Sequence, residues 1–131
     1  YTGTDYVYPP IDNPANNAFF AAYKKRWNQL PGEIALNAYT TVRFIVKAIK
    51  KAGKVDREAM IDAAEGLSID HPVLGTFTVR EFDHQSTAGW WFGYLTWDAT
   101  HNRPGMRDTK FFKGEDYLPT KAEIEKLRTK K

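Results

Sequence analysis

The longest regular pattern of hydrophobic positions lies between residues 34 and 52. Its apolar side chains recur at steps of three and four, the spacing of one helix face, at Ile34, Ala38, Val42, Ile45, Ile49 and Ala52. Positive side chains fall on the opposite side of the same helix, at Arg43, Lys47, Lys50 and Lys54. Gly53 suits the left-handed turn that ends a helix. The pattern therefore predicts an amphipathic helix with a buried apolar face and a solvated cationic face.

Local start and stop signals predict three further helices. Asn13 can cap a helix with its side chain, and Pro14 fits the first helical position, where its missing N–H is not needed. This helix should end near Trp27, before the breaker Pro31-Gly32. Two shorter helices are expected later in the chain, one capped by Asp56 and ending near Gly66, the other C-terminal with a capping box of Thr120 and Glu123.

Strand-like alternation occurs only late in the chain. Residues 76–80 alternate, and residues 90–97 (Trp-Trp-Phe-Gly-Tyr-Leu-Thr-Trp) are too hydrophobic for a strand exposed on both faces. Residues 1–10 read as extended and residues 98–114 as irregular. We therefore expect mostly helices plus two late strands. Because two strands make a poor sheet, the chain should be incomplete on its own and form a piece of a larger sheet protein.

Composition and charge exclude several classes of function. The chain has 131 residues, enough for one domain or part of one, and its lack of cysteine excludes disulfides and thiolate chemistry. Lys plus Arg is 19 and Asp plus Glu is 16, but residues 121–131 alone carry five cations and two anions. The rest of the chain is balanced in charge. A basic tail on a balanced body argues against a nucleic-acid partner.

The sequence offers few residues for catalysis. His84 in Asp83-His84-Gln85 could be a general base, but neighbours on a turn seldom converge, and we interpret Asp83 as bonding nearby backbone. His71, His84 and His101 lack the short spacing of metal ligands. There is no Gly-rich phosphate loop and no Gly-x-Ser-x-Gly turn. We therefore expect no catalytic residue, no metal site and no cofactor; a hydrolase using His84 is the disfavoured alternative.

The aromatic residues of the second strand allow two interpretations. They could line a site for a sugar or an aromatic ligand, but alternation puts Trp91 and Tyr94 on opposite faces. We favour core packing together with cover for a sheet edge. An alternative function follows from that edge: the Trp90–Trp97 strand could recruit a partner strand or a second copy, making the chain a stand-alone interaction module.

Several short motifs occur in the order and spacing of one protein family. They are Asn13-Pro14-Ala15-Asn16-Asn17-Ala18-Phe19 with Ala22-Tyr23, Pro31 with Ala35 and Tyr39, Ala48-Ile49-Lys50-Lys51-Ala52-Gly53, Ala63-Ala64-Glu65-Gly66-Leu67, Pro72 with Gly75, and Val79-Arg80 with Asp83-His84-Gln85. Over roughly residues 10–97 the chain resembles the C-terminal portion of the type I periplasmic solute-binding proteins of branched-chain amino acid ABC transporters.

The resemblance implies an α/β fold that is the C-terminal part of a two-lobed protein, whose lobes close on a ligand between them. It implies a binding protein and not an enzyme, periplasmic or extracellular and membrane-tethered. Such a protein captures a small amino acid, amide or carboxylic acid and delivers it to an ABC permease. Residues 1–97 would form the helical layer and strands of a lobe, and residues 98–131 an irregular segment and a short helix. The N-terminal portion of the same protein would complete the fold.

The resemblance also marks a ligand-binding position. In relatives a hydrophobic residue just before the second helix approaches the ligand. Ile34 matches that position best, with Leu36 and Asn37 as its neighbours. Ile34 is equally the first residue of the apolar helix face, and both interpretations stay open.

Overall fold

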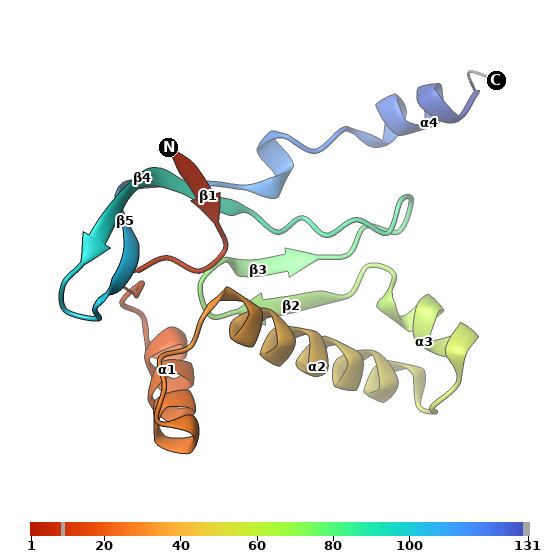
Figure 1. Cartoon of the computed structure of the whole chain (residues 1–131). Helices are drawn as coiled ribbons and strands as arrows, with labels where there is room; N and C mark the ends of the chain where they lie inside the picture. Colours follow the sequence, from red (N-terminus) through yellow and green to blue (C-terminus); the bar gives the residue numbers. More distant parts are fainter. Residues whose placement is uncertain (9, 130–131) are drawn as a thin grey trace.

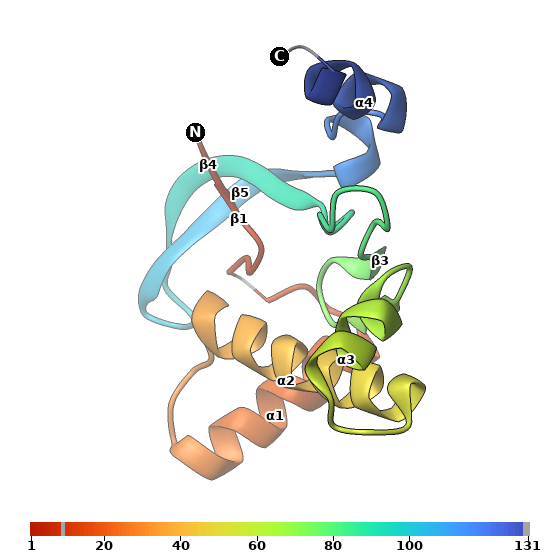
Figure 2. The same cartoon turned by 90° about the vertical axis from the view of Figure 1, so that its right-hand side faces the viewer.

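The computed structural model describes residues 1–8 and 10–129. Its elements are β1 (Thr2–Thr4), α1 (Pro14–Trp27), α2 (Glu33–Ala52), α3 (Arg57–Ala64), β2 (Ser68–His71), β3 (Gly75–Thr78), β4 (Trp90–Asp98), β5 (Arg103–Phe112), a 3₁₀ turn (Gly114–Asp116) and α4 (Lys121–Thr129). The β2–β3 hairpin lies beside α2, β1 joins β4 and β5 in a second sheet, and α4 lies apart from this body (Figures 1 and 2).

The helix boundaries follow the local signals in the sequence. The Asn13 side chain accepts a hydrogen bond from the Asn16 backbone N–H at 2.9 Å, and Asp56 accepts one from Ala59 at 3.0 Å. Gly53 ends α2 in the left-handed region, with φ of 71°. The capping box before α4 forms as well, since the backbone and hydroxyl of Thr120 both donate to Glu123. All four predicted helices are confirmed.

The expectation of only two strands is wrong. Residues 68–71 form β2, which pairs antiparallel with β3, and residues 103–112, expected to be irregular, form β5 along the whole of β4. Neither strand is strongly hydrophobic, so pairing with a neighbour defines it more than its own pattern does. The division of the chain at residue 97 stays a prediction. Pro9 of the expected extended segment, and Lys130 and Lys131 of the basic tail, lie outside the described residues.

The strand at residues 90–97 is not an edge strand. The sheet order is β1-β4-β5, so β4 is central, and β1 covers its other side at Trp91, Phe92 and Gly93. An interaction module that recruits a partner through this strand needs a free edge, and here the edge is partly occupied. We therefore do not retain that alternative.

Helix α2 buries a different side from the predicted one: its buried residues are Leu36, Thr40 and Ala48. Ile34 is 78% exposed and Val42 60% exposed, although both belong to the face expected to be buried. The cationic side instead leans on β2, where Arg43 donates to the Asp70 carbonyl at 3.1 Å and Lys47 to the Ser68 carbonyl at 2.8 Å. Amphipathicity predicted a helix correctly, but the elements available in this chain decide which face is covered.

The hydrophobic core lies where the N-terminal segment, α1, α2 and the β2–β3 turn meet. Its buried members are Tyr6, Tyr8, Phe19, Leu36 and Val73. Trp91 packs against this cluster from β4. The core thus joins the three-stranded sheet to the helices.

Candidate functional site

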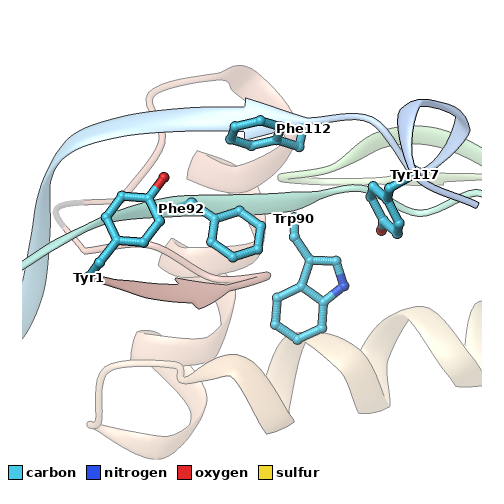
Figure 3. Close-up of a pocket in the computed structure, with 5 residues that line it drawn as sticks. All are labelled: Tyr1, Trp90, Phe92, Phe112 and Tyr117. Atoms are coloured by element: carbon cyan, nitrogen blue, oxygen red, sulfur yellow. The ribbon is translucent and has the colours of Figure 1, made fainter.

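The first pocket lies on the outer face of the three-stranded sheet. It has a volume of about 500 Å³ and is lined by five aromatic residues, Tyr1, Trp90, Phe92, Phe112 and Tyr117 (Figure 3). Antiparallel pairing sets Trp90 opposite Phe112. The rings of Phe92 and Phe112 meet edge to face with centroids 5.4 Å apart, and Tyr1 stacks on Phe92 at 6.0 Å. We call it the aromatic pocket.

The polar character of the aromatic pocket is confined to a few groups. The Tyr117 hydroxyl is already engaged, donating to the Ala88 carbonyl at 2.8 Å. The Lys110 ammonium lies 5.0 Å from the centre of the Phe112 ring, a cation–π contact. The pocket can therefore hold a flat apolar group but offers little to orient a polar one.

The second pocket lies between α2, the β2–β3 hairpin and the segment that follows β1. It has a volume of about 320 Å³ and combines polar side chains (Asp5, Asn37, Thr40, His71) with apolar walls that include Phe44 and Phe77. Asn37 donates from its amide to Asp5 Oδ2 at 2.7 Å. Burial raises the pKa of Asp5. We call it the polar pocket.

His71 is held in one tautomer at this pocket. Its Nδ1 accepts hydrogen bonds from the backbone N–H groups of Val73 and Leu74, both at 3.1 Å. Burial, with a smaller contribution from the charge of Arg43, lowers the pKa of His71 to about 4. The imidazole is therefore neutral at physiological pH, and because Nδ1 is an acceptor its proton sits on Nε2.

The three predicted ligand-binding residues do not converge on one point. Ile34 is exposed at the first turn of α2, Leu36 is fully buried in the core, and Asn37 lines the polar pocket. Helical geometry turns neighbouring side chains to different sides, which explains the divergence. The ligand-binding role of all three stays a prediction.

The residues considered for catalysis or as metal ligands have structural partners. His84 Nε2 lies 2.8 Å from Glu65 Oε1, and His101 Nδ1 lies 2.6 Å from Asp98 Oδ2. Asp83 pairs with Arg80, whose hydrogen bond lowers the pKa of Asp83. Asp83 also accepts from the Gln85 backbone at 3.1 Å, as the turn interpretation predicted. Within residues 1–8 and 10–129, no group of three His, Asp or Glu side chains could hold a metal ion.

Sequence reasoning missed most of the pocket residues. Asp5 and Thr40 carry no motif, Phe112 falls in the segment read as irregular, and Tyr117 lies just beyond that segment. The one available signal was the aromatic pair Phe111-Phe112, which suits a strand beside the Trp-rich one. The sites form only when segments distant in sequence meet.

Concave pockets with many apolar and few polar groups are typical of proteins that bind small molecules. Residues 1–101 match a family model described as periplasmic binding protein. The chain therefore belongs to the periplasmic binding protein family. No helix among the described residues is long and apolar enough to cross a membrane. Among curated proteins, none matches the chain.

Solved structures show the same relationship. A protein described as an ABC-type branched-chain amino acid transporter, from Rhodopseudomonas palustris CGA009, is 26% identical, with a TM-score of 0.74 over 87% of this chain and 30% of its own. A solute-binding protein from R. palustris BisB5, in complex with 3,4-dihydroxybenzoic acid, is 21% identical, with a TM-score of 0.74 over 93% of this chain and 32% of its own.

A third structure, the leucine-, isoleucine-, valine-, threonine- and alanine-binding protein of Brucella ovis, is 21% identical, with a TM-score of 0.71 over 91% of this chain and 32% of its own. The chain thus spans about a third of the length of these proteins. The resemblance to the type I binding proteins of the branched-chain amino acid transporter family is confirmed. So is an α/β fold that corresponds to part of their two-lobed structure.

Proposed function

We propose that this chain is part of the substrate-binding component of an ABC importer, which captures a small amino acid, amide or carboxylic acid. The observation that carries the proposal is the family match over residues 1–101. The similar structures add support, since they are described as transporter or solute-binding proteins. On this proposal the protein acts by binding and release in the periplasm, or outside the cell on a membrane tether, and is not an enzyme.

The proposal includes two protein partners. One is the membrane permease that accepts the solute. The other is the N-terminal portion of the same binding protein, which would supply the remaining surface of both lobes. The exposed apolar side of α2 supports this second partner, because Ile34, Val42, Ile45 and Val46 are all more than two fifths exposed on one helix. A continuous apolar helix face in water marks a surface made for further contacts.

Ile34 is the best candidate for a direct ligand contact among the predicted residues. It lies at the first turn of α2 and has little packing of its own, as its exposure of 78% shows. Asn37 would act through the polar pocket, where its amide holds Asp5. Leu36 has no exposed surface, so its contribution would be to fix the helix that carries the other two.

A ligand panel tests the proposal. Isothermal titration of the longer binding protein with amino acids, amides and carboxylic acids should show submillimolar binding of at least one compound. Ile34→Ala should then weaken that compound by several-fold and leave the melting temperature unchanged. Val55→Ala is the matched control, because Val55 is equally exposed, at 82%, outside the α2 start. Absence of any binding compound would remove the support for transport.

A further inference from the structure

The aromatic pocket leaves a contiguous apolar surface in water. Tyr1 is 73% exposed, and Trp90 and Tyr117 are each at least two fifths exposed. The same face continues along β4 to Tyr94, whose ring meets Tyr1 edge to face with centroids 5.4 Å apart. A contiguous patch of exposed apolar side chains marks a contact surface, whereas single exposed ones do not. These rings reach the surface, so a segment that covers them can touch them directly.

The walls of the aromatic pocket suit protein side chains better than a free solute. A small-molecule site combines apolar walls with a few polar groups that fix the orientation of the ligand. Here the five lining residues are all aromatic (Figure 3), and the Tyr117 hydroxyl already donates to the Ala88 carbonyl. Apolar side chains of another segment need no orienting groups, because their own backbone holds them in place. The chemistry of the walls therefore favours a covering segment of protein.

The edge of the sheet beside the pocket is open. β1 (Thr2–Thr4) pairs with β4, and in the sheet order β1-β4-β5 it is an outer strand. Among the described residues, no strand pairs with the side of β1 that faces away from β4. An open edge presents backbone N–H and C=O groups to which a further strand can bind. Tyr1 precedes β1 and also lines the pocket, so the open edge and the exposed rings are adjacent.

We propose that a strand from the N-terminal portion of the longer binding protein pairs with this open edge of β1 and places apolar side chains over the aromatic pocket. The length of the similar structures supports this occupant, because the chain covers only 30–32% of each of the three compared. The larger part of such a protein is therefore available to cover the chain. This inference rests on the proposed function for the existence of that portion, and it adds which surface the portion meets.

Hydrogen exchange measured by mass spectrometry tests the strand pairing. The β1 amides that face away from β4 should exchange about tenfold more slowly in the longer binding protein than in the 131-residue chain, because a hydrogen-bonded edge opens less often. β5 (Arg103–Phe112) is the matched control, since it forms the opposite edge of the same sheet. Its exchange rates should be the same in the two proteins.

Two tryptophan substitutions test the cover over the pocket. Trp97 is 60% exposed and, by the alternation of β4, lies on the face opposite to Trp90. In the 131-residue chain, Trp90→Ala and Trp97→Ala should lower the melting temperature by similar small amounts, because both rings are exposed. In the longer protein Trp90→Ala should lower it several-fold more than Trp97→Ala, because only Trp90 is then packed under other side chains.

Unchanged exchange of the β1 amides, an equal gain of protection at β5, or equal effects of the two substitutions in the longer protein would each overturn the added strand. The last result would mean that the pocket stays open, as a small molecule or another protein would require. The ligand panel is read separately. A panel compound that binds while β1 stays unprotected removes only this inference, and a protected β1 with no panel compound bound removes only the transport proposal.

Discussion

The two pockets of this chain differ in how their walls are made. The aromatic pocket is a surface feature, built from rings on the outer face of a sheet; its polar groups are few, and one of them, the Tyr117 hydroxyl, is already paired. The polar pocket reaches into the interior, and three of its polar atoms are unpaired. Apolar surface left in water is common in proteins, whereas an unsatisfied buried polar atom is rare. The second pocket therefore differs from the first by the unsatisfied hydrogen-bonding capacity of its walls.

Substitutions on the two faces of β4 should show the largest effect on stability and test this contrast between the pockets. Trp91 points to the interior, where it packs on Phe111 with ring centroids 5.1 Å apart and donates to the Val73 carbonyl at 3.4 Å. Trp91→Ala should lower the free energy of unfolding by about 3–4 kcal/mol, because it removes a large ring from the core. Trp90→Ala, on the aromatic-pocket face, should lower it by less than about 1 kcal/mol.

Urea unfolding followed by circular dichroism measures both variants against the wild type. Trp90 is the matched control, since it is the same residue type on the adjacent position of the same strand. Similar losses for the two variants would mean that the aromatic pocket is part of the core, and the contrast between the pockets would disappear.

The buried histidine provides the second test, through pH. The pKa of His71 is lowered from 6.5 to about 4, so between those values the unfolded chain takes up a proton that the folded chain does not. The free energy of unfolding should therefore fall as the pH drops from 6.5 to 4, by roughly 3 kcal/mol from this residue. About one pH unit above 6.5 and higher, where both states are deprotonated, the residue should contribute no pH dependence.

His71→Asn isolates this contribution, because asparagine can still accept from the backbone but does not titrate in this range. Urea unfolding at a series of pH values measures the free energy of unfolding of both proteins. As the pH falls from 6.5 to 4, the wild type should lose stability relative to the variant. His84→Asn is the control, since His84 is exposed and its φ of 59° suits asparagine. If the free energy of unfolding depended on pH in the same way for the wild type and for His71→Asn, the imidazole would not be buried as described.

The smallest expected effect has an unusual sign. Thr40→Val keeps the side-chain shape and removes an unpaired hydroxyl, so it should raise the free energy of unfolding by about 1 kcal/mol. Thr87→Val should do the opposite by a similar amount, because the Thr87 hydroxyl accepts from the Thr78 backbone at 3.0 Å. Thermal unfolding of the two variants side by side measures both changes. Destabilisation by Thr40→Val would show that its hydroxyl is satisfied in solution.

Local signals in the sequence were enough for the helices and for two strands, β3 and β4. Asn13 with Pro14, Gly53, and Thr120 with Glu123 each act within a few residues of themselves, and each forms as predicted. β5 and β2 were missed because their stability comes from pairing with β4 and β3. The family resemblance was inferred from the order of short motifs in the sequence, which can be read without knowing how the strands pair.

The candidate sites were less accessible to sequence reasoning than the fold. Asn37 was singled out, but its partner Asp5 lies 32 residues earlier and has no motif of its own. His71 was considered only as a metal ligand, and its burial against the β2–β3 turn could not be seen from spacing. A binding site depends on which distant atoms remain unpaired after folding, and that is a property of packing.

By itself the sequence determined where helices begin and end, the absence of thiol chemistry, and the family to which the chain belongs, because caps, composition and motif order are properties of neighbouring residues. Only the tertiary structure decided which side of α2 is covered, that β4 lies in the middle of its sheet, and that Asp5, Thr40 and His71 line one pocket. Those outcomes require contacts between segments far apart in the chain. A periodic pattern specifies an element but not the surface it will meet.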